Sequence, residues 1–243
     1  DIAYALDKQK ISKINIAVIG EEQKLYTKQV NSALNILKKP PIEIIHYSLV
    51  LGKDGKMSTR KGNVTLLSDL INDVNELAKK EIKSRTKGKI SNSKKISNSA
   101  IIYSILRVSP EKNVIFDPKQ AVKFEGDTGP YQLYTYARIN SLLKKTKSGI
   151  VNPKLVNDYE LELIKHLSKF PNIALKSIIN KKTNLVPNYC AELCQKFNSY
   201  YSQNIIISED KKLTSHRIGI SKLVKQVISN CMFIMGIDTI QEM

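Results

Sequence analysis

The chain has 243 residues, of which 42% are hydrophobic and 25% charged, the composition of an ordinary soluble globular protein. Its 39 Lys and Arg residues exceed its 22 Asp and Glu residues, so the net charge is +17, which favours a polyanionic partner such as nucleic acid. No run of about 18 apolar residues occurs, and the N-terminus lacks the pattern of a signal peptide. The sequence therefore predicts neither a membrane-spanning helix nor secretion.

Three cysteines are too few for a small disulfide-bonded scaffold, and they favour a reducing cytoplasm. Cys190 and Cys194 would share one face of a helix, but a structural metal site needs about four ligands. None of the three histidines lies near this pair in the sequence. We therefore interpret the cysteines as small buried hydrophobic side chains and predict no structural metal.

The first 51 residues alternate between strand-like and helix-like patterns. Residues 14–19 are a β-branched run, which predicts a buried strand. Apolar residues spaced three to five apart predict a helix over 22–38, which Pro40 and Pro41 end. Residues 42–51 are again strand-like. A strand, a helix and a strand in succession predict one βαβ crossover, whose two strands run parallel.

The remainder of the chain mostly follows the period of a helix. Apolar residues from Leu67 to Ala78 form one stripe, for which Thr65 or Ser68 is the predicted N-cap. Residues 86–99, rich in Ser, Lys and Asn, predict a loop. Further helices are predicted over 100–106, 129–147, 153–169, 171–181, 186–203 and 210–235. The predicted fold class is mixed and mainly α, part of an α/β layer followed by an all-helical region.

One segment concentrates cations and hydroxyls directly after a predicted strand. Residues 55–63 read Gly-Lys-Met-Ser-Thr-Arg-Lys-Gly-Asn. The cations Lys56, Arg60 and Lys61 and the hydroxyls between them suit an anion with several oxygens, such as a triphosphate. Composition alone would favour a basic surface loop. The order of the letters, however, resembles the KMSKS signature of class I aminoacyl-tRNA synthetases, in the form typical of arginyl-tRNA synthetase.

Other segments extend this resemblance, in the right order, over essentially the whole chain. Residues 1–4 resemble the end of the family's Thr-Arg-Asp-Ile-Ala-Tyr strand, and residues 124–131 resemble the opening of its helical anticodon-binding domain. Residues 197–217 and 236–243 match its later helices and its C-terminus. The resemblance implies the C-terminal half of a Rossmann-type α/β catalytic domain, followed by an all-α anticodon-binding bundle of the DALR type.

The same resemblance divides the chain into three parts. Residues 1–63 would complete the catalytic domain, 64–122 would form a connecting helical region containing the basic loop 86–99, and 123–243 would form the anticodon-binding domain. The family's other signature, His-x-Gly-His, and its N-terminal tRNA-elbow domain do not occur in these residues. We therefore expect a C-terminal part of the enzyme that is inactive alone.

The resemblance also implies the roles of substrate-binding residues. Asp1 would bind the guanidinium of arginine, since a carboxylate matches that planar fork with two hydrogen bonds. Gln23 would be a second arginine ligand, although an exposed Gln at a helix start is an equally good interpretation. The catalytic cations would be Lys56, Arg60 and Lys61. The ATP loop would comprise Lys56, Met57, Ser58, Thr59, Arg60 and Lys61.

For tRNA, the matching positions are Tyr131, Arg138 and Tyr201, which would hold the anticodon loop by stacking and phosphate pairing. The family usually reads Pro-Tyr-x-Gln-Tyr, but here the Gln is shifted by one position. Because a helix turns about 100° per residue, Gln132 faces elsewhere, and no role is assigned to it. Tyr134 and Tyr136 are interpreted as core residues.

The sequence thus predicts part of an arginine–tRNA ligase that forms arginyl-adenylate from arginine and ATP, with Mg²⁺ accompanying ATP, and transfers arginine to tRNA(Arg). We expect a cytoplasmic monomer that binds no membrane. The main alternative is a non-catalytic tRNA-binding module that kept the bundle and lost activation. A basic helical DNA-binding protein is a more distant alternative, because Tyr-rich helix faces with few Arg argue against it.

Overall fold

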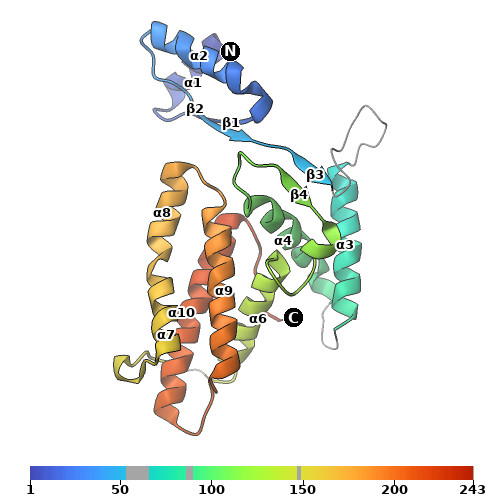
Figure 1. Cartoon of the computed structure of the whole chain (residues 1–243), viewed down its shortest axis with the longest axis vertical. Helices are drawn as coiled ribbons and strands as arrows, with labels where there is room; N and C mark the ends of the chain where they lie inside the picture. The colour runs from blue at the N-terminus through green and yellow to red at the C-terminus, as the bar shows by residue number, and fades with distance from the viewer. Residues whose placement is uncertain (53–65, 86–89, 147–148, 243) are drawn as a thin grey trace.

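The computed structural model describes residues 1–52, 66–85, 90–146 and 149–242. These residues form a small α/β layer at the N-terminus, a pair of short strands with helices beside them, and a bundle of long helices (Figure 1). The predicted fold class, mixed and mainly α, is confirmed.

The N-terminal layer is one βαβ crossover preceded by a helix. Its elements are α1 (Ile2–Ile11), β1 (Ile16–Gly20), η1 (Glu21–Gln23), α2 (Lys24–Ile36) and β2 (Glu43–Tyr47). Strands β1 and β2 pair in parallel, with Ile16 opposite Glu43, so the predicted crossover is confirmed. Both strands lie on one side of α1 and α2 (Figure 1).

The start of the chain differs from its prediction. Residues 1–4 begin helix α1 instead of ending a strand. Asp1 is the N-cap, and its carbonyl accepts a hydrogen bond from the Ala5 N–H at 2.8 Å. Ala5 is buried. Ala5 is the one residue through which α1 is buried in the layer; its other residues are half-buried or exposed.

Strand β1 also differs, because only one of its faces is covered. Ala17 and Ile19 line a cavity together with residues of α1 and α2. Ile16 and Val18 point to the other face and are 52% and 63% exposed. Successive side chains of a strand alternate between faces. The predicted strand is present, but it is half-buried on one face and exposed on the other, so the prediction that it is buried is wrong.

A second parallel pair joins β3 (Val50–Gly52) to β4 (Val114–Phe116), so the predicted strand 42–51 is two strands in separate sheets. The break occurs where the backbone turns to another partner. The Ser48 N–H donates to the Pro110 carbonyl at 2.8 Å, and the Leu49 N–H donates to the Asn113 side chain at 3.1 Å. These N–H groups therefore cannot pair with β1, and the chain continues beside β4 instead.

The next helices are α3 (Leu67–Lys83), α4 (Ser93–Leu106) and α5 (Pro118–Ala121), with a 3₁₀ turn, η3, at Ile90–Asn92. The predicted helical stripe of α3 is confirmed, but Ser68 lies inside the helix and is not its cap; Thr65 is outside the described residues. Residues 93–99 are helical, so the predicted loop is wrong there.

The reason for helix α4 is burial. Ile96, Ala100 and Tyr103 are each at most 1% exposed, and they lie on the side that packs against other helices. The serine hydroxyls find partners inside the helix: Ser97 and Ser99 donate to carbonyls three residues earlier, at 3.0 and 2.8 Å. Apolar packing thus outweighs the loop preference of a Ser- and Asn-rich segment.

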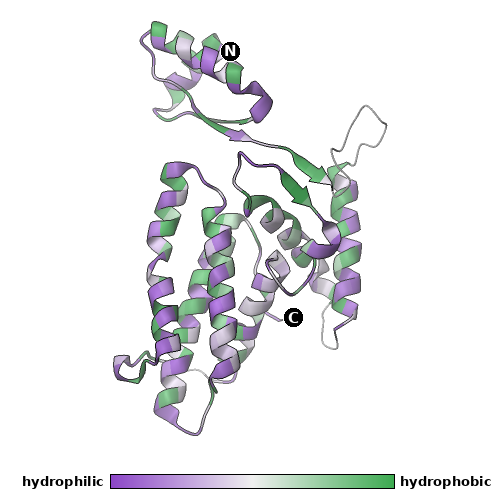
Figure 2. Cartoon of the chain, viewed as in Figure 1, coloured by the Kyte–Doolittle hydropathy of each residue, from purple (hydrophilic) through white to green (hydrophobic). Residues whose placement is uncertain are grey.

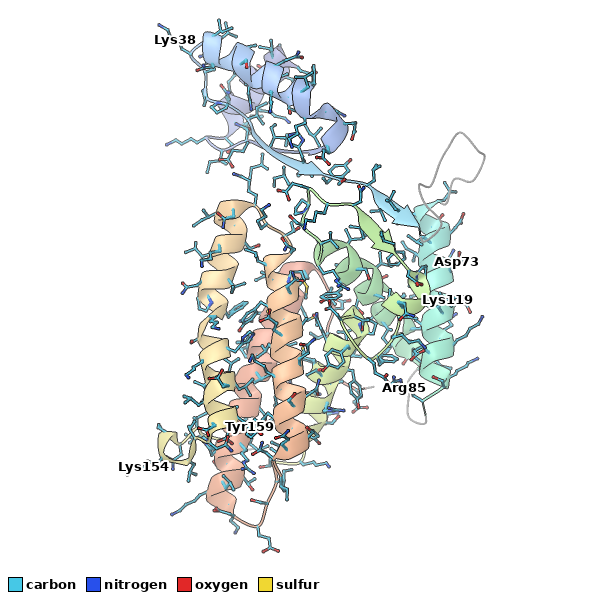
Figure 3. The ribbon with its side chains drawn as sticks, viewed as in Figure 1. Lys38, Asp73, Arg85, Lys119, Lys154 and Tyr159 are labelled. Carbon is cyan, nitrogen blue, oxygen red and sulfur yellow. The ribbon has the colours of Figure 1, made fainter. Side chains whose placement is uncertain are left out.

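The bundle confirms the helices predicted from residue 129 onward, except that the predicted helix 153–169 is a 3₁₀ turn followed by a separate α-helix. It consists of α6 (Gly129–Leu143), the 3₁₀ turn η4 (Pro153–Leu155), α7 (Asp158–Ser168), α8 (Phe170–Asn180), α9 (Leu185–Gln203) and α10 (Lys211–Met235). Thr128 caps α6 by accepting the Tyr131 N–H at 3.1 Å. Gly236 ends α10 with φ +71°, as a C-terminal glycine should. Lys154 and Tyr159 mark the end of the bundle farther from the N-terminal layer (Figure 3).

The hydrophobic core is continuous from Val74 in α3 to Ile240 near the C-terminus. Hydrophobic and hydrophilic residues alternate around the bundle helices, as inward- and outward-facing sides require (Figure 2). Cys190 and Cys194 are free and fully buried, which confirms their interpretation as core residues.

Among the described helices, α10 alone is long and apolar enough to cross a membrane by length and composition. Half of its most apolar stretch is buried inside the fold. Its buried residues, among them Ile220, Val224 and Ile228, belong to the common core. This is the arrangement of a core helix in a bundle.

Candidate functional site

The first candidate site is a cavity of about 190 Å³ in the N-terminal layer. Asp1, at the start of α1, and Gln23, at the end of η1, both line it, so the fold brings together the two predicted arginine ligands. Ala17, Ile19 and residues of α2 form its walls. The cavity thus lies between one face of the two-stranded sheet and the helices α1 and α2.

Polar side chains surround Asp1 in this cavity. The Tyr26 hydroxyl donates a hydrogen bond to Asp1 Oδ2. Lys8 also lines the cavity, and its ammonium lies 4.3 Å from the centre of the Tyr4 ring. A carboxylate oriented by a tyrosine hydroxyl is a good acceptor for a cationic group. Sequence reasoning missed Tyr26, whose helical position gave no functional signal.

The predicted ATP loop, Lys56 to Lys61, lies outside the described residues. The structure describes its flanks: β3 ends at Gly52, and α3 begins at Leu67. The roles assigned to this segment remain predictions.

The second candidate site is centred on Arg138, at the middle of α6. Its Nη1 donates to Asn198 Oδ1 on α9 at 2.6 Å, and its Nη2 donates to the Tyr134 hydroxyl at 2.7 Å. The guanidinium lies 4.6 Å from the centre of the Tyr134 ring and 5.2 Å from the centre of the Tyr201 ring. Arg138 is therefore held by two directed hydrogen bonds and contacts two aromatic rings, which fixes a charge that is normally mobile.

Asn198 connects this arginine to the third predicted residue. Its Nδ2 donates to the Tyr131 hydroxyl at 2.9 Å and to the Thr135 hydroxyl at 2.8 Å. Burial raises the pKa of Tyr131, while the hydrogen bond from Asn198 acts against that rise. Tyr131 is half-buried and Tyr201 is 36% exposed. Asn198 thus links Tyr131 to Arg138, and the Arg138 guanidinium in turn lies beside the Tyr201 ring.

A cavity of about 200 Å³ opens beside this cluster. Arg138 and Tyr201 line it, together with Lys145 just beyond the end of α6. The Tyr201 ring leans on the buried Phe197 ring, with centres 6.1 Å apart and planes inclined by 37°. A supported aromatic ring beside two cations can stack on a nucleobase and pair with a phosphate.

Sequence reasoning missed two members of this cluster. Tyr134 was interpreted as core, yet it lines the cavity and bonds to Arg138; their i, i+4 spacing was the available signal. Asn198 had no signal of its own, because its role depends on how α9 packs against α6. Tyr136 is buried, as interpreted. Gln132 is fully buried, and neither its side-chain oxygen nor its nitrogen has a hydrogen-bond partner among the described residues.

Two family models match the chain, one over its N-terminal part and one over its C-terminal part. The catalytic domain of class I (R) tRNA synthetases matches residues 1–117, and the DALR anticodon binding domain matches residues 132–243. The chain belongs to the arginyl-tRNA synthetase family. Asp1, Gln23 and the segment 56–61 fall in the catalytic match, whereas Arg138 and Tyr201 fall in the anticodon-binding match, which begins one residue after Tyr131.

Curated relatives agree with this assignment to the synthetase family. The chain is 32% identical to the arginine–tRNA ligase of Clostridium perfringens, over 100% of the chain and 46% of the relative. It is 33% identical to that of Methanococcus aeolicus, over 98% of the chain and 44% of the relative. The chain therefore spans about half the length of the curated relatives that it matches.

Solved structures agree on the fold. The structure of Thermus thermophilus arginyl-tRNA synthetase superposes with a TM-score of 0.87 at 22% identity, over 96% of the chain and 41% of that protein. The Plasmodium falciparum arginyl-tRNA synthetase superposes with a TM-score of 0.78 at 21% identity, over 94% of the chain and 41% of that protein. At these identities the likeness shows the fold alone.

Proposed function

We propose that this chain supplies the arginine pocket and the anticodon-arm surface of an arginine–tRNA ligase. The ligase would form arginyl-adenylate from arginine and ATP, with Mg²⁺ accompanying ATP, and then transfer arginine to tRNA(Arg). A cytoplasmic monomer that binds no membrane belongs to the same proposal.

In the N-terminal cavity, the Asp1 carboxylate would accept two parallel hydrogen bonds from the guanidinium of the substrate arginine. The planar guanidinium matches the geometry of a carboxylate. The Tyr26 hydroxyl, which already donates to Asp1 Oδ2, would keep the carboxylate oriented. Gln23 lines the same cavity, and its amide would bind the side chain of the substrate arginine. The cations of residues 56–61 would neutralise charge on the phosphates of ATP.

The observation that carries the RNA part of the proposal is the Arg138 cluster. Arg138 is fixed by Asn198 and Tyr134, and its guanidinium lies beside the partly exposed ring of Tyr201. An ordered cation beside a supported ring matches a phosphate next to an unpaired base, as in an anticodon loop. A randomly basic surface would need no such ordering.

Titration of the chain with the tRNA(Arg) anticodon arm and with an unrelated stem-loop, at two salt concentrations, tests this part. Non-specific attraction fades steeply with salt for both RNAs, whereas recognition leaves a preference for the arm. Tyr201→Ala should weaken arm binding by about 1–3 kcal/mol, the cost of losing one stacked base. Tyr201→Phe, which keeps the ring, is the matched control. Equal loss for both RNAs would reject the stacking role.

The catalytic part is tested separately with the full-length protein. Arginine-dependent ATP–pyrophosphate exchange, measured with tRNA(Arg) present, should be clear above the blank. No exchange, together with intact arm binding, would instead favour the non-catalytic tRNA-binding module.

A further inference from the structure

A fully buried carboxylate lies at the end of the bundle where α7 begins, next to Tyr159 (Figure 3). Glu160 is 0% exposed. Its Oε1 accepts the Tyr200 hydroxyl at 3.1 Å and the Arg217 Nε–H at 3.3 Å. Its Oε2 accepts the Asn157 backbone N–H at 2.9 Å and lies 3.2 Å from His216 Nε2. The carboxylate thus joins α7, α9 and α10 at one point.

The ring of His216 is oriented within this cluster. The Asn152 backbone N–H donates to His216 Nδ1 at 2.9 Å, so Nδ1 is the acceptor and Nε2 carries the proton donated to Glu160. Arg217 also bonds to the chain that follows α9, because its Nη1 donates to the Ile205 carbonyl at 2.6 Å. Each carboxylate oxygen therefore has two donors, which a buried charge requires.

This cluster fixes the last turns of α9 in rotation as well as in position. The Tyr200 ring is buried and its hydroxyl is bonded to Glu160. A helix turns about 100° per residue, so the direction of Tyr200 determines the direction of Tyr201. Asn198, three residues before Tyr201, lies on the same side of the helix. Both of these residues contact Arg138 on α6.

We propose that Glu160, acting through the Tyr200 hydroxyl, is a positioning residue that orients Tyr201 and Asn198 onto Arg138 and so preforms the RNA-stacking surface. The RNA part of this inference rests on the proposed function. A surface held in its binding orientation loses less conformational freedom on binding, so its affinity is higher. The cluster contacts no RNA; its effect would pass through the setting of α9.

Tyr200→Phe is the sharpest test, because it removes one hydroxyl and keeps the buried ring. If about a tenth to a third of molecules then hold the competent orientation, affinity for the anticodon arm falls about 3- to 10-fold. In the Tyr201→Ala background the same change should cost less affinity, because only the effect through Asn198 and Arg138 remains. A double-mutant cycle therefore separates action through Tyr201 from an independent effect.

Ile228→Val is the control for a merely structural role. Ile228 is fully buried in α10 and is not part of the hydrogen-bonded cluster, so its truncation loosens the bundle without touching the end of α9. The three chains are compared at temperatures where all are fully folded. Arm affinity should fall for Tyr200→Phe and stay unchanged for Ile228→Val. Two outcomes would overturn the inference. One is an equal loss of arm affinity in Tyr200→Phe and Ile228→Val. The other is a loss from Tyr200→Phe that is the same in the wild-type and Tyr201→Ala backgrounds.

A second measurement needs no RNA. Hydrogen exchange at the Arg138 guanidinium, followed by NMR, reports its bonds to Asn198 and Tyr134. Exchange should accelerate in Tyr200→Phe and not in Ile228→Val; an unchanged rate in both would overturn the inference. Wild-type chain that fails to prefer the anticodon arm would refute the proposed function instead, while this exchange measurement still decides the positioning role.

Discussion

Replacing Arg138 distinguishes an ordered stacking surface from simple charge attraction. Arg138→Lys keeps the charge but loses the planar fork, and with it one of the two bonds to Asn198 and Tyr134 and the contacts with two rings. A hydrogen bond involving a charged group contributes about 1.5–3 kcal/mol, and a cation–π contact at an exposed site about 0.5–1 kcal/mol. Because Arg138 is only partly buried and Lys keeps one bond, we expect a net loss of about 1–2 kcal/mol in arm affinity, or about 5- to 30-fold.

The salt dependence of binding supplies the second half of this test. Arg138→Lys should leave the slope of log affinity against log salt unchanged, since the phosphate is still paired. Arg138→Gln should flatten that slope by about 0.7, the value for one phosphate of a single strand. Lys145→Gln, in the same cavity, is the control: it should flatten the slope without changing affinity at high salt.

The measurement is a fluorescence titration of the anticodon arm at several salt concentrations, after thermal unfolding has shown that each variant folds. If Arg138→Lys keeps the wild-type affinity at every salt concentration and only Arg138→Gln loses it, Arg138 acts only as a charge. The reasoning from its ordered geometry would then be refuted.

Three further outcomes are expected. In the full-length ligase, Asp1→Asn should raise the arginine KM by about 10- to 150-fold with the ATP KM unchanged, because a hydrogen bond to a charged group contributes about 1.5–3 kcal/mol; an unchanged arginine KM in steady-state assays would reject the pocket. Lys56→Ala or Lys61→Ala should slow single-turnover adenylate formation more than it weakens ATP binding; equal losses would indicate ground-state binding. Burial opposes ionisation of Glu160, but hydrogen bonds from Asn157, His216 and Tyr200 outweigh it and hold the pKa of Glu160 below its ordinary value. The ionised Glu160 therefore stabilises the fold above about pH 4.3, and this stabilisation is lost as pH falls through the lower pKa of the folded state. In Glu160→Gln, the free energy of unfolding in urea should fall less between about pH 6 and pH 3 than in the wild type. The same pH profile in both proteins would contradict the stabilising role of the Glu160 carboxylate.

Residues with strong local chemistry made much of the fold predictable. Gly129 with the following proline marked the start of α6, and Gly236 marked the end of α10. Apolar periodicity located the helices between them. What failed was decided by distant contacts: α4 is helical over its Ser-rich start because Ile96 is buried there, and β4 is a three-residue strand that forms by pairing with β3.

The candidate sites divide in the same way. Arg138 and Tyr201 were predictable only from a resemblance, since an arginine or a tyrosine on a helix has no unique meaning. Asn198 and Glu160 were missed, because each acts through a neighbouring helix and local sequence contains no record of helix packing; Tyr134 was missed although its i, i+4 spacing to Arg138 on the same helix was visible. The missed residues are those that hold others in place.

The predicted limit between the connecting region and the anticodon-binding domain, at residue 123, stays a prediction that the packing makes testable. Helix α4 lies against α6, and Ile96 and Tyr103 are buried in the core that both helices share. The contact is close: a side chain at Gly129 would come within 2.1 Å of the Ser99 carbonyl oxygen. Tyr103 also donates its hydroxyl to Asp127, just before α6. These contacts tie residues on both sides of the limit.

A chain of residues 66–243 should therefore unfold cooperatively and bind the anticodon arm, whereas residues 123–243 alone should not. Burial of one large apolar side chain contributes about 1.5–3 kcal/mol. Loss of the partners that α4 supplies, including Ile96, Ile101 and Tyr103, would remove a large part of the about 5–15 kcal/mol that holds a domain folded. Thermal unfolding followed by circular dichroism, together with arm titration, compares the two chains. If the shorter chain unfolds as sharply and binds as tightly as the longer one, α4 is dispensable, and the limit at residue 123 marks a domain that folds independently.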